Sequence, residues 1–279
     1  MRKLYKPEEV VKTVFLSCID NMHETPLKEN LRAVVGDVEK EAELYDQNGQ
    51  NVKFFQMTQQ NSPLVTNKQL ENVYTNKFAK KGQPGRDLYD KLMALPKQGT
   101  CPFCGQRVVS TLDHYLPKAF FPLLAVVPVN LVAACSECNK TKLASIPQCE
   151  EDQTLHPYYD DVEQEQWLYA EVLRDIPVSL RFFVDPPNGW DDVLKARIKK
   201  HFDDLKLGAL YASHSGSELS VQRIMLSKVA ERGGVVRVRE QLQDSFDAYY
   251  SLHVNSWQTA MYQALTINDW YCEGGFNNL

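Results

Sequence analysis

The chain has 279 residues, 43% of them hydrophobic and 24% charged, which is typical of a soluble globular protein and excludes an intrinsically disordered one. No segment approaches the roughly 18 apolar residues of a membrane span, and the N-terminus lacks the apolar core of a secretory signal, so we expect a cytoplasmic protein with no membrane contact. The formal net charge of −5 is unsuited to coating nucleic acid with basic side chains alone, so any polynucleotide contact should be local or shared with a partner.

Apolar residues at helical spacing dominate the first hundred positions. The stretches with this pattern are residues 6–21, 26–42, 67–79 and 86–95. Residues 1–98 are therefore predicted to form a helical N-terminal region.

The composition then changes to paired cysteines, β-branched runs and prolines, which indicates a compact module over residues 99–160. The remainder, residues 161–279, is predicted to be mostly helical with a short β-hairpin, whose strands are expected at 167–173 and 178–184. The whole chain is thus predicted to be mainly α-helical, with one small α+β module.

Four of the seven cysteines form two close pairs, Cys101 with Cys104 and Cys135 with Cys138, separated by 30 residues. In a cytosolic chain this spacing indicates a metal site before a disulfide. Each pair can present two thiolates to one ion, and four thiolates complete the tetrahedral shell of zinc. Because such a shell leaves no position for water, the sequence predicts a structural zinc and not a catalytic one.

Between the cysteine pairs, a β-branched run over 108–112 predicts a strand that delivers a carboxylate and an imidazole side by side, Asp113 and His114. Asn130 opens a second short apolar run. Asn139 directly follows the last cysteine and should lie in the first turn of a helix over residues 139–142.

Together these features resemble the HNH endonucleases, whose pattern is a cysteine pair, a strand ending in Asp-His, a proline, Asn-Leu-Val, and a cysteine pair followed by Asn-x-x-Lys. Besides the cysteines, the matching residues are Asp113, His114, Pro117, Asn130, Leu131, Val132, Asn139 and Lys142. The match covers about 45 of the 279 residues, and within that span the types, order and spacing of these motif residues agree together. Asn139 stands where some members have histidine, and asparagine is a known alternative there.

The resemblance implies a ββα-metal, treble-clef-like nuclease module that is stapled by zinc. It implies that His114 is the general base that deprotonates the attacking water, a role that suits a near-neutral imidazole. Asp113 and Asn139 would supply oxygen ligands to one Mg²⁺ or Mn²⁺, which stabilises the leaving 3′ oxygen. Asn130 would hold the loop backbone and keep His114 oriented.

Alternatives stay open at each position. An Asp-His pair at a strand end is commonly a satisfied surface or capping pair, and Asn139 suits a helix cap. The basic residues around the predicted site either contact a phosphate backbone or are ordinary solvated charges. These are Lys118, Lys140 and Lys142.

His156 lies just after the module, in the segment His156-Pro157-Tyr158. It could fold back as a third metal ligand or as a phosphate contact. It could equally pack against its two neighbours and close the module. The sequence does not decide between these roles.

The segment 112–118, with Phe121-Pro122 and His156-Pro157-Tyr158, is similar to stand-alone bacterial HNH proteins that are encoded beside an ATPase. Some of these serve in anti-phage defence, including Septu-type and retron-linked systems. This similarity implies nucleic acid as substrate, DNA ahead of RNA, and an ATPase as protein partner. An RNA-directed nuclease, for example one acting on tRNA, remains a second hypothesis. A non-catalytic zinc-dependent binding module is a third, against which the intact Asp113, His114 and Asn139 argue.

Overall fold

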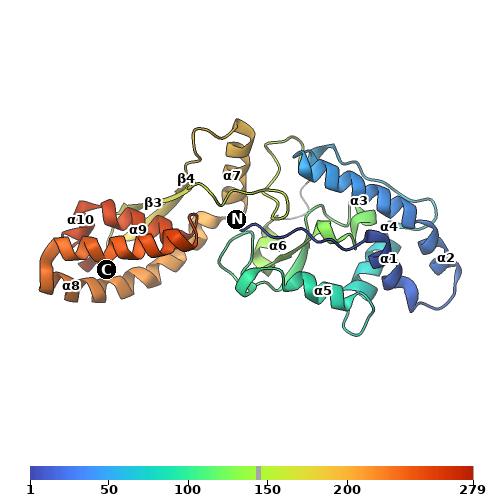
Figure 1. Cartoon of the computed structure of the whole chain (residues 1–279), viewed down its shortest axis with the longest axis horizontal. Helices are drawn as coiled ribbons and strands as arrows, with labels where there is room; N and C mark the ends of the chain where they lie inside the picture. The colour runs from blue at the N-terminus through green and yellow to red at the C-terminus, as the bar shows by residue number, and fades with distance from the viewer. Residues whose placement is uncertain (143–145, 279) are drawn as a thin grey trace. The chain divides into compact units, whose positions relative to one another are not determined.

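The computed structural model describes residues 1–142 and 146–278. It confirms a mainly helical chain with two small antiparallel sheets (Figure 1). The chain divides into two compact units, Met1–Asp161 and Val162–Leu279. The helices of residues 1–98 and the cysteine-rich segment lie together in the first unit.

Two of the N-terminal helices begin at residues whose side chains cap them. Thr25 accepts a hydrogen bond from the Lys28 backbone, and Thr66 forms a reciprocal capping box with Gln69. The helices are α1 (Val11–Asp20), α2 (Pro26–Ala33), α3 (Val35–Gln50), α4 (Asn67–Val73) and α5 (Arg86–Met93). The helical pattern after Pro26 is divided in two, because the backbone of Val34 departs from helical geometry with ψ near 0°.

A ββα arrangement follows. Strand β1 (Thr111–His114) pairs antiparallel with β2 (Leu131–Ala134), and helix α6 (Ser136–Lys142) comes directly after β2. The register places Asp113 opposite Val132 and His114 opposite Leu131. The loop between the strands contains two 3₁₀ turns, η4 (Pro122–Leu124) and η5 (Pro128–Asn130).

The structure corrects two boundaries of the sequence prediction. The strand expected from residue 108 begins only at Thr111, because the residues before it close the turn of the first cysteine pair, where Val108 bridges Thr100. The helix expected from residue 139 begins at Ser136, so Asn139 donates its backbone N–H to the Cys135 carbonyl at 3.1 Å. Asn139 therefore lies within the helix and is not its cap.

The cysteine-rich segment and the N-terminal helices share one hydrophobic core. Leu112 and Leu131 of the sheet are buried in the same cluster as Phe15 of α1 and Val38 and Tyr45 of α3. A module of about 60 residues buries little apolar surface alone. The helices therefore provide the apolar surface against which the small sheet packs.

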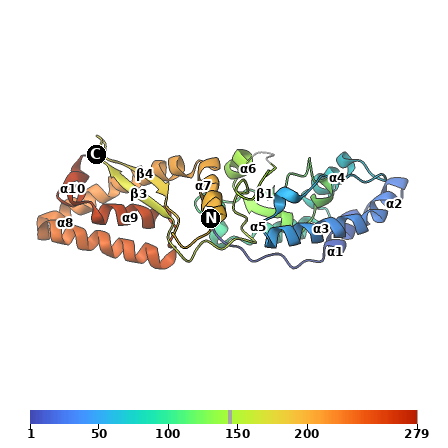
Figure 2. The same ribbon diagram turned by 90° about the horizontal axis from the view of Figure 1, so that it is seen from above.

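The second unit combines a hairpin with helices. Strands β3 (Leu168–Leu173) and β4 (Ser179–Val184) pair antiparallel. The helices are α7 (Asp192–Asp204), α8 (Leu207–Leu252), α9 (Trp257–Ile267) and α10 (Asp269–Cys272). Gly234 interrupts α8 with φ of 65°, a conformation that glycine adopts readily, and the chain turns back there (Figure 2). The side chain of Asn255 fixes the start of the hairpin by accepting the backbone N–H groups of Trp167 and Leu168.

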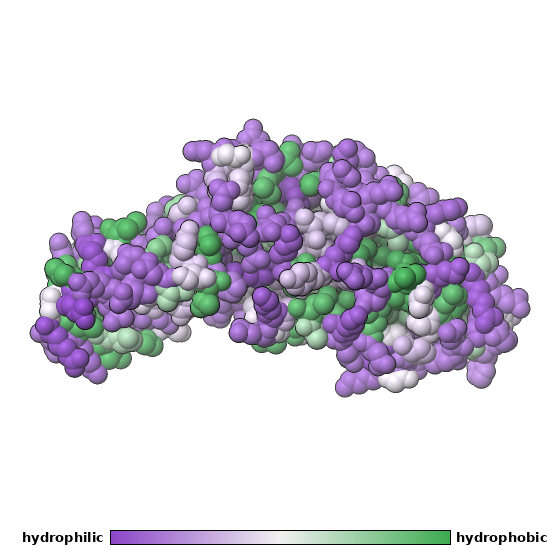
Figure 3. Space-filling view, in the orientation of Figure 1, coloured by the Kyte–Doolittle hydropathy of each residue, from purple (hydrophilic) through white to green (hydrophobic). Residues whose placement is uncertain are grey.

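None of the helices in the described part of the chain combines the length and the apolar character needed to cross a membrane. On the face drawn in Figure 3, hydrophilic side chains predominate and hydrophobic ones form small groups among them.

Candidate metal and catalytic site

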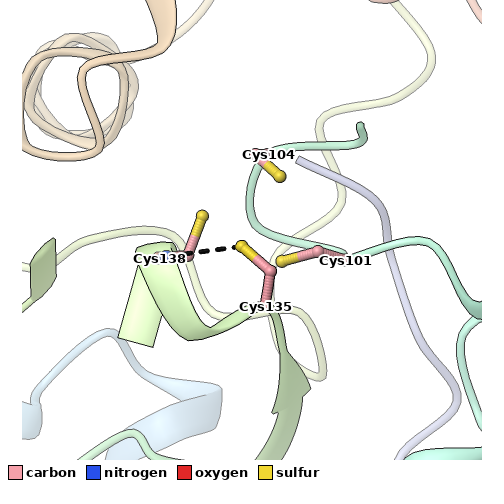
Figure 4. A group of neighbouring side chains, drawn as sticks. All are labelled: Cys101, Cys104, Cys135 and Cys138. Atoms are coloured by element: carbon pink, nitrogen blue, oxygen red, sulfur yellow. Dashed lines mark hydrogen bonds between the residues drawn. The ribbon is translucent and has the colours of Figure 1, made fainter. Parts of the chain in front are cut away.

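The four predicted cysteines converge. Their side chains come together in one place (Figure 4). Their sulfur atoms all lie within 4.8 Å of one another, and all four residues are buried. Four buried thiols at this separation fit a structural metal such as zinc. Within residues 1–142 and 146–278, no second group of three or more His, Cys, Asp or Glu ligand atoms comes together.

In each cysteine pair, a backbone N–H donates a hydrogen bond to one of the two sulfur atoms. The backbone N–H of Arg107 donates to the Cys104 sulfur at 3.4 Å, and the N–H of Cys138 donates to the Cys135 sulfur at 3.3 Å. Hydrogen bonds among the four thiols lower the pKa of Cys104 and Cys135 and raise the pKa of Cys101 and Cys138. Gly105 makes the tight turn possible with a φ of 62°, a region that favours glycine. The two backbone N–H donors thus favour the deprotonated sulfur of Cys104 and Cys135, the state that binds zinc.

His114 ends β1, and one nitrogen of its imidazole is held by a backbone carbonyl. Its Nε2 lies 2.9 Å from the carbonyl oxygen of Ala125. Because a carbonyl only accepts, Nε2 carries the hydrogen and Nδ1 holds the free lone pair of the neutral ring. Burial, with a further contribution from the Lys118 cation, lowers the pKa of His114 to about 3. The imidazole is therefore neutral at pH 7, with the lone pair on Nδ1 unprotonated, and its pKa in the free protein lies well below the near-neutral value expected from the sequence.

Asn130 closes the loop that carries this carbonyl. Its side chain is fully buried, accepts the backbone N–H of Leu116 at 2.8 Å, and donates to the carbonyls of Leu116 and Leu124 at 3.0 and 3.3 Å. Leu124 directly precedes Ala125. Asn130 thus holds the backbone of the loop next to Ala125, and its positioning role toward His114 stays a prediction.

Asn130→Ala is expected to lower the free energy of unfolding of the first unit by about 2 to 4 kcal/mol, because it leaves buried backbone groups without partners. Scanning calorimetry measures this as a lower transition temperature. Asn61→Ala, at an exposed asparagine of the same unit, should leave the transition unchanged. A buried-site variant as stable as the exposed-site control would show that the loop does not depend on Asn130.

The carboxylate of Asp113 is paired with a lysine side chain of the same chain. The Lys142 ammonium lies 2.8 Å from the Asp113 carboxylate and also donates to the carbonyls of His114 and Tyr115, at 3.3 and 2.7 Å. The side chains of the pair are 8% and 5% exposed, so Lys142 is an internal partner of Asp113, whereas the sequence placed it among the substrate contacts.

Asn139 lies three residues before Lys142 in α6, so both side chains project from one face of the helix. Lys142 reaches Asp113, which places this face toward the end of β1. The amide of Asn139 has no hydrogen-bond partner among the residues that the structure describes. Carboxylate and amide oxygens are hard donors, and such a donor set fits Mg²⁺ or Mn²⁺ better than a soft metal.

The other predicted substrate lysines reach solvent. Lys140 is exposed on α6, and Lys118 is partly exposed, with its ammonium 5.4 Å from the centre of the Tyr74 ring. Both are thus available to a phosphate group.

His156 is fully buried, and both of its ring nitrogens are engaged. Nδ1 accepts the backbone N–H of Tyr158 at 3.1 Å, so Nε2 carries the hydrogen and donates to the Tyr45 hydroxyl at 2.9 Å. This placement matches the packing alternative and leaves no lone pair for a metal ion.

Protein ea31 of Escherichia phage lambda is similar to this chain, with 32% identity over 224 residues that cover 75% of each of the two chains. The chain belongs to the ea31 family. No family model matches the sequence, and no solved structure matches it significantly. The name ea31 states no activity, so the chemistry of this ea31-family chain has to be inferred from its site.

Sequence reasoning missed one residue of the site in this ea31-family chain. Tyr74 contacts His114 edge-on, with 4.4 Å between the ring centres. It comes from the helical region 40 residues earlier, where a lone tyrosine in an amphipathic pattern is indistinguishable from an ordinary core residue.

Proposed function

We propose that this protein is a metal-dependent endonuclease of the HNH type that hydrolyses phosphodiester bonds in nucleic acid. The observation that carries the proposal is the imidazole of His114, which is neutral, held by the Ala125 carbonyl and adjacent to Asp113 at the end of β1. The neighbouring four-cysteine cluster supports it, because a structural zinc there would fix the start of α6 and with it Asn139.

The residues divide the chemistry among them. Nδ1 of His114 takes a proton from water as the water oxygen attacks phosphorus. The bond from phosphorus to the 3′ oxygen breaks, and that oxygen leaves with a proton from solvent, which gives 5′-phosphate and 3′-hydroxyl ends. Asp113 and Asn139 would hold Mg²⁺ or Mn²⁺, which stabilises negative charge on the leaving oxygen. Lys118 and Lys140 bind the phosphate backbone on either side.

Lys142 keeps the site ordered before a divalent cation is bound. An isolated buried carboxylate is costly, and the ammonium neutralises it at hydrogen-bonding distance. A divalent cation bound at Asp113 would repel the positively charged ammonium group of Lys142.

DNA is the substrate that we propose first, in anti-phage defence with an ATPase as partner. The net charge of −5 supports the need for a partner, because a chain with a net negative charge is poorly suited to hold a polyanion by charge alone. The second unit contributes none of the residues proposed here for chemistry, so we propose that it binds the partner or the polynucleotide.

The purified chain should cleave at least one of plasmid, single-stranded DNA and tRNA in Mg²⁺ or Mn²⁺, and a chelator that spares the bound zinc should stop it. Cleavage of tRNA alone would replace DNA by RNA as the substrate. Tight binding to nucleic acid without cleavage under any of these conditions would contradict the nuclease proposal and favour a zinc-dependent binding module.

A further inference from the structure

We propose that Tyr74 is a positioning residue of the nuclease site, whose ring fixes the imidazole of His114. The inference rests on the proposed function. It assigns a role to the helical N-terminal region, which the HNH resemblance does not reach.

The contacts of Tyr74 place it between the base and a cation. Its ring meets the His114 ring edge-on, with 4.4 Å between centres and 71° between planes. The Lys118 ammonium lies 5.4 Å from the centre of the same ring, within the range of a cation–π interaction. One side chain thus contacts both the proposed base and a proposed phosphate ligand.

His114 needs this second support. The single hydrogen bond from Nε2 to Ala125 sets where that nitrogen lies, but the imidazole can still tilt about the N–H···O direction. Such a tilt would move Nδ1, the atom that receives the proton. The Tyr74 ring contacts the imidazole at a steep angle and opposes this motion, so Nδ1 stays aimed at the attacking water.

The backbone and the core hold Tyr74 firmly. It begins a π-helical turn, η2 (Tyr74–Phe78), in which Ala79 donates its N–H to the Tyr74 carbonyl at 2.8 Å. Such turns are rare and occur frequently at functional sites. The ring of Phe78, which is fully buried, stacks on Tyr74 with 5.7 Å between centres. Tyr74 is therefore held rigidly by η2 and by Phe78, and it can support the imidazole of His114.

The test compares Tyr74→Leu with Tyr74→Phe. Without the ring, kcat should fall about 10- to 100-fold while KM stays near wild type, because a small misplacement of a reacting group is that costly. Tyr74→Phe keeps the ring and should retain wild-type kcat. Tyr89→Leu is the matched control, since Tyr89 also packs on Phe78 but belongs to α5, outside the proposed site. It should retain full activity.

A second readout does not depend on activity. The ring protons of His114 sense the ring current of Tyr74, so their NMR resonances should move in Tyr74→Leu and stay in place in Tyr74→Phe and Tyr89→Leu. If the wild type does not cleave at all, the nuclease proposal fails, while the resonances still report the contact. Three results would each overturn the positioning role. They are unmoved His114 resonances in Tyr74→Leu, wild-type kcat in Tyr74→Leu, and a loss of kcat in Tyr74→Phe as large as that in Tyr74→Leu.

Discussion

His114→Ala is expected to lower the rate of phosphodiester cleavage by about 10² to 10⁴-fold, the usual cost of losing a general base. Zinc content and affinity for nucleic acid should stay close to wild type, because the base acts on water in the transition state and adds little to ground-state binding. Cleavage kinetics, metal analysis and a binding titration measure the three quantities. His23→Ala, at an exposed histidine far along the sequence from the site, is the control and should cleave normally.

The ligand variants should behave differently from the base variant. Asp113→Asn is preferable to alanine, because an amide oxygen still accepts from the buried Lys142 ammonium. Asp113→Asn and Asn139→Ala should both inactivate by weakening the divalent cation, and raised Mn²⁺ should restore part of their activity. Raised Mn²⁺ should not restore the activity of His114→Ala. Equal Mn²⁺ rescue of all three variants would contradict the assignment of base and ligands.

Cys135→Ser is expected to release the zinc and to unfold the first unit at a much lower temperature. Structural zinc in small peptides contributes about 10 to 16 kcal/mol of binding free energy at neutral pH, and loss of one of four ligands removes a large part of it. Since the cysteine-rich segment shares its core with α1 and α3, the loss should extend beyond the module to those helices.

Scanning calorimetry tests this prediction, because the second unit serves as an internal reference in the same sample. The two units should give separate transitions, and only that of residues 1–161 should shift. Cys149→Ser, at an exposed cysteine outside the cluster, should change neither transition nor the zinc content. A Cys135→Ser chain that stays folded and active without zinc would falsify the structural role.

The sequence predicted the parts of the site that depend on short-range spacing. Each cysteine pair is closed by a local turn, and the antiparallel pairing of β1 with β2 brings the two pairs together. Asp113 and His114 are neighbours in the sequence and lie together at the end of β1. The role of Asn130 followed from the family pattern, and its contacts in the structure are compatible with it.

What the sequence could not predict depends on tertiary packing. Whether a lysine in α6 meets a phosphate or an internal carboxylate depends on how the helix lies against β1, and Lys142 meets Asp113. The sequence left two roles open for His156, a metal ligand or a buried core residue. The structure decides between them, because Tyr45 of α3 lies beside the ring and hydrogen-bonds to Nε2. Tyr74 likewise approaches His114 only through the packing of η2.

The most direct test of the central claim is the chemistry of the product ends. End-labelled DNA and RNA are incubated with wild type and with His114→Ala in Mn²⁺, and the fragments are analysed for terminal phosphate. We predict 5′-phosphate and 3′-hydroxyl fragments from the wild type, and no fragments from the variant or after divalent ions are removed. Fragments that persist at the wild-type rate in His114→Ala, or that carry 2′,3′-cyclic phosphate ends, would contradict hydrolysis by water activated at His114.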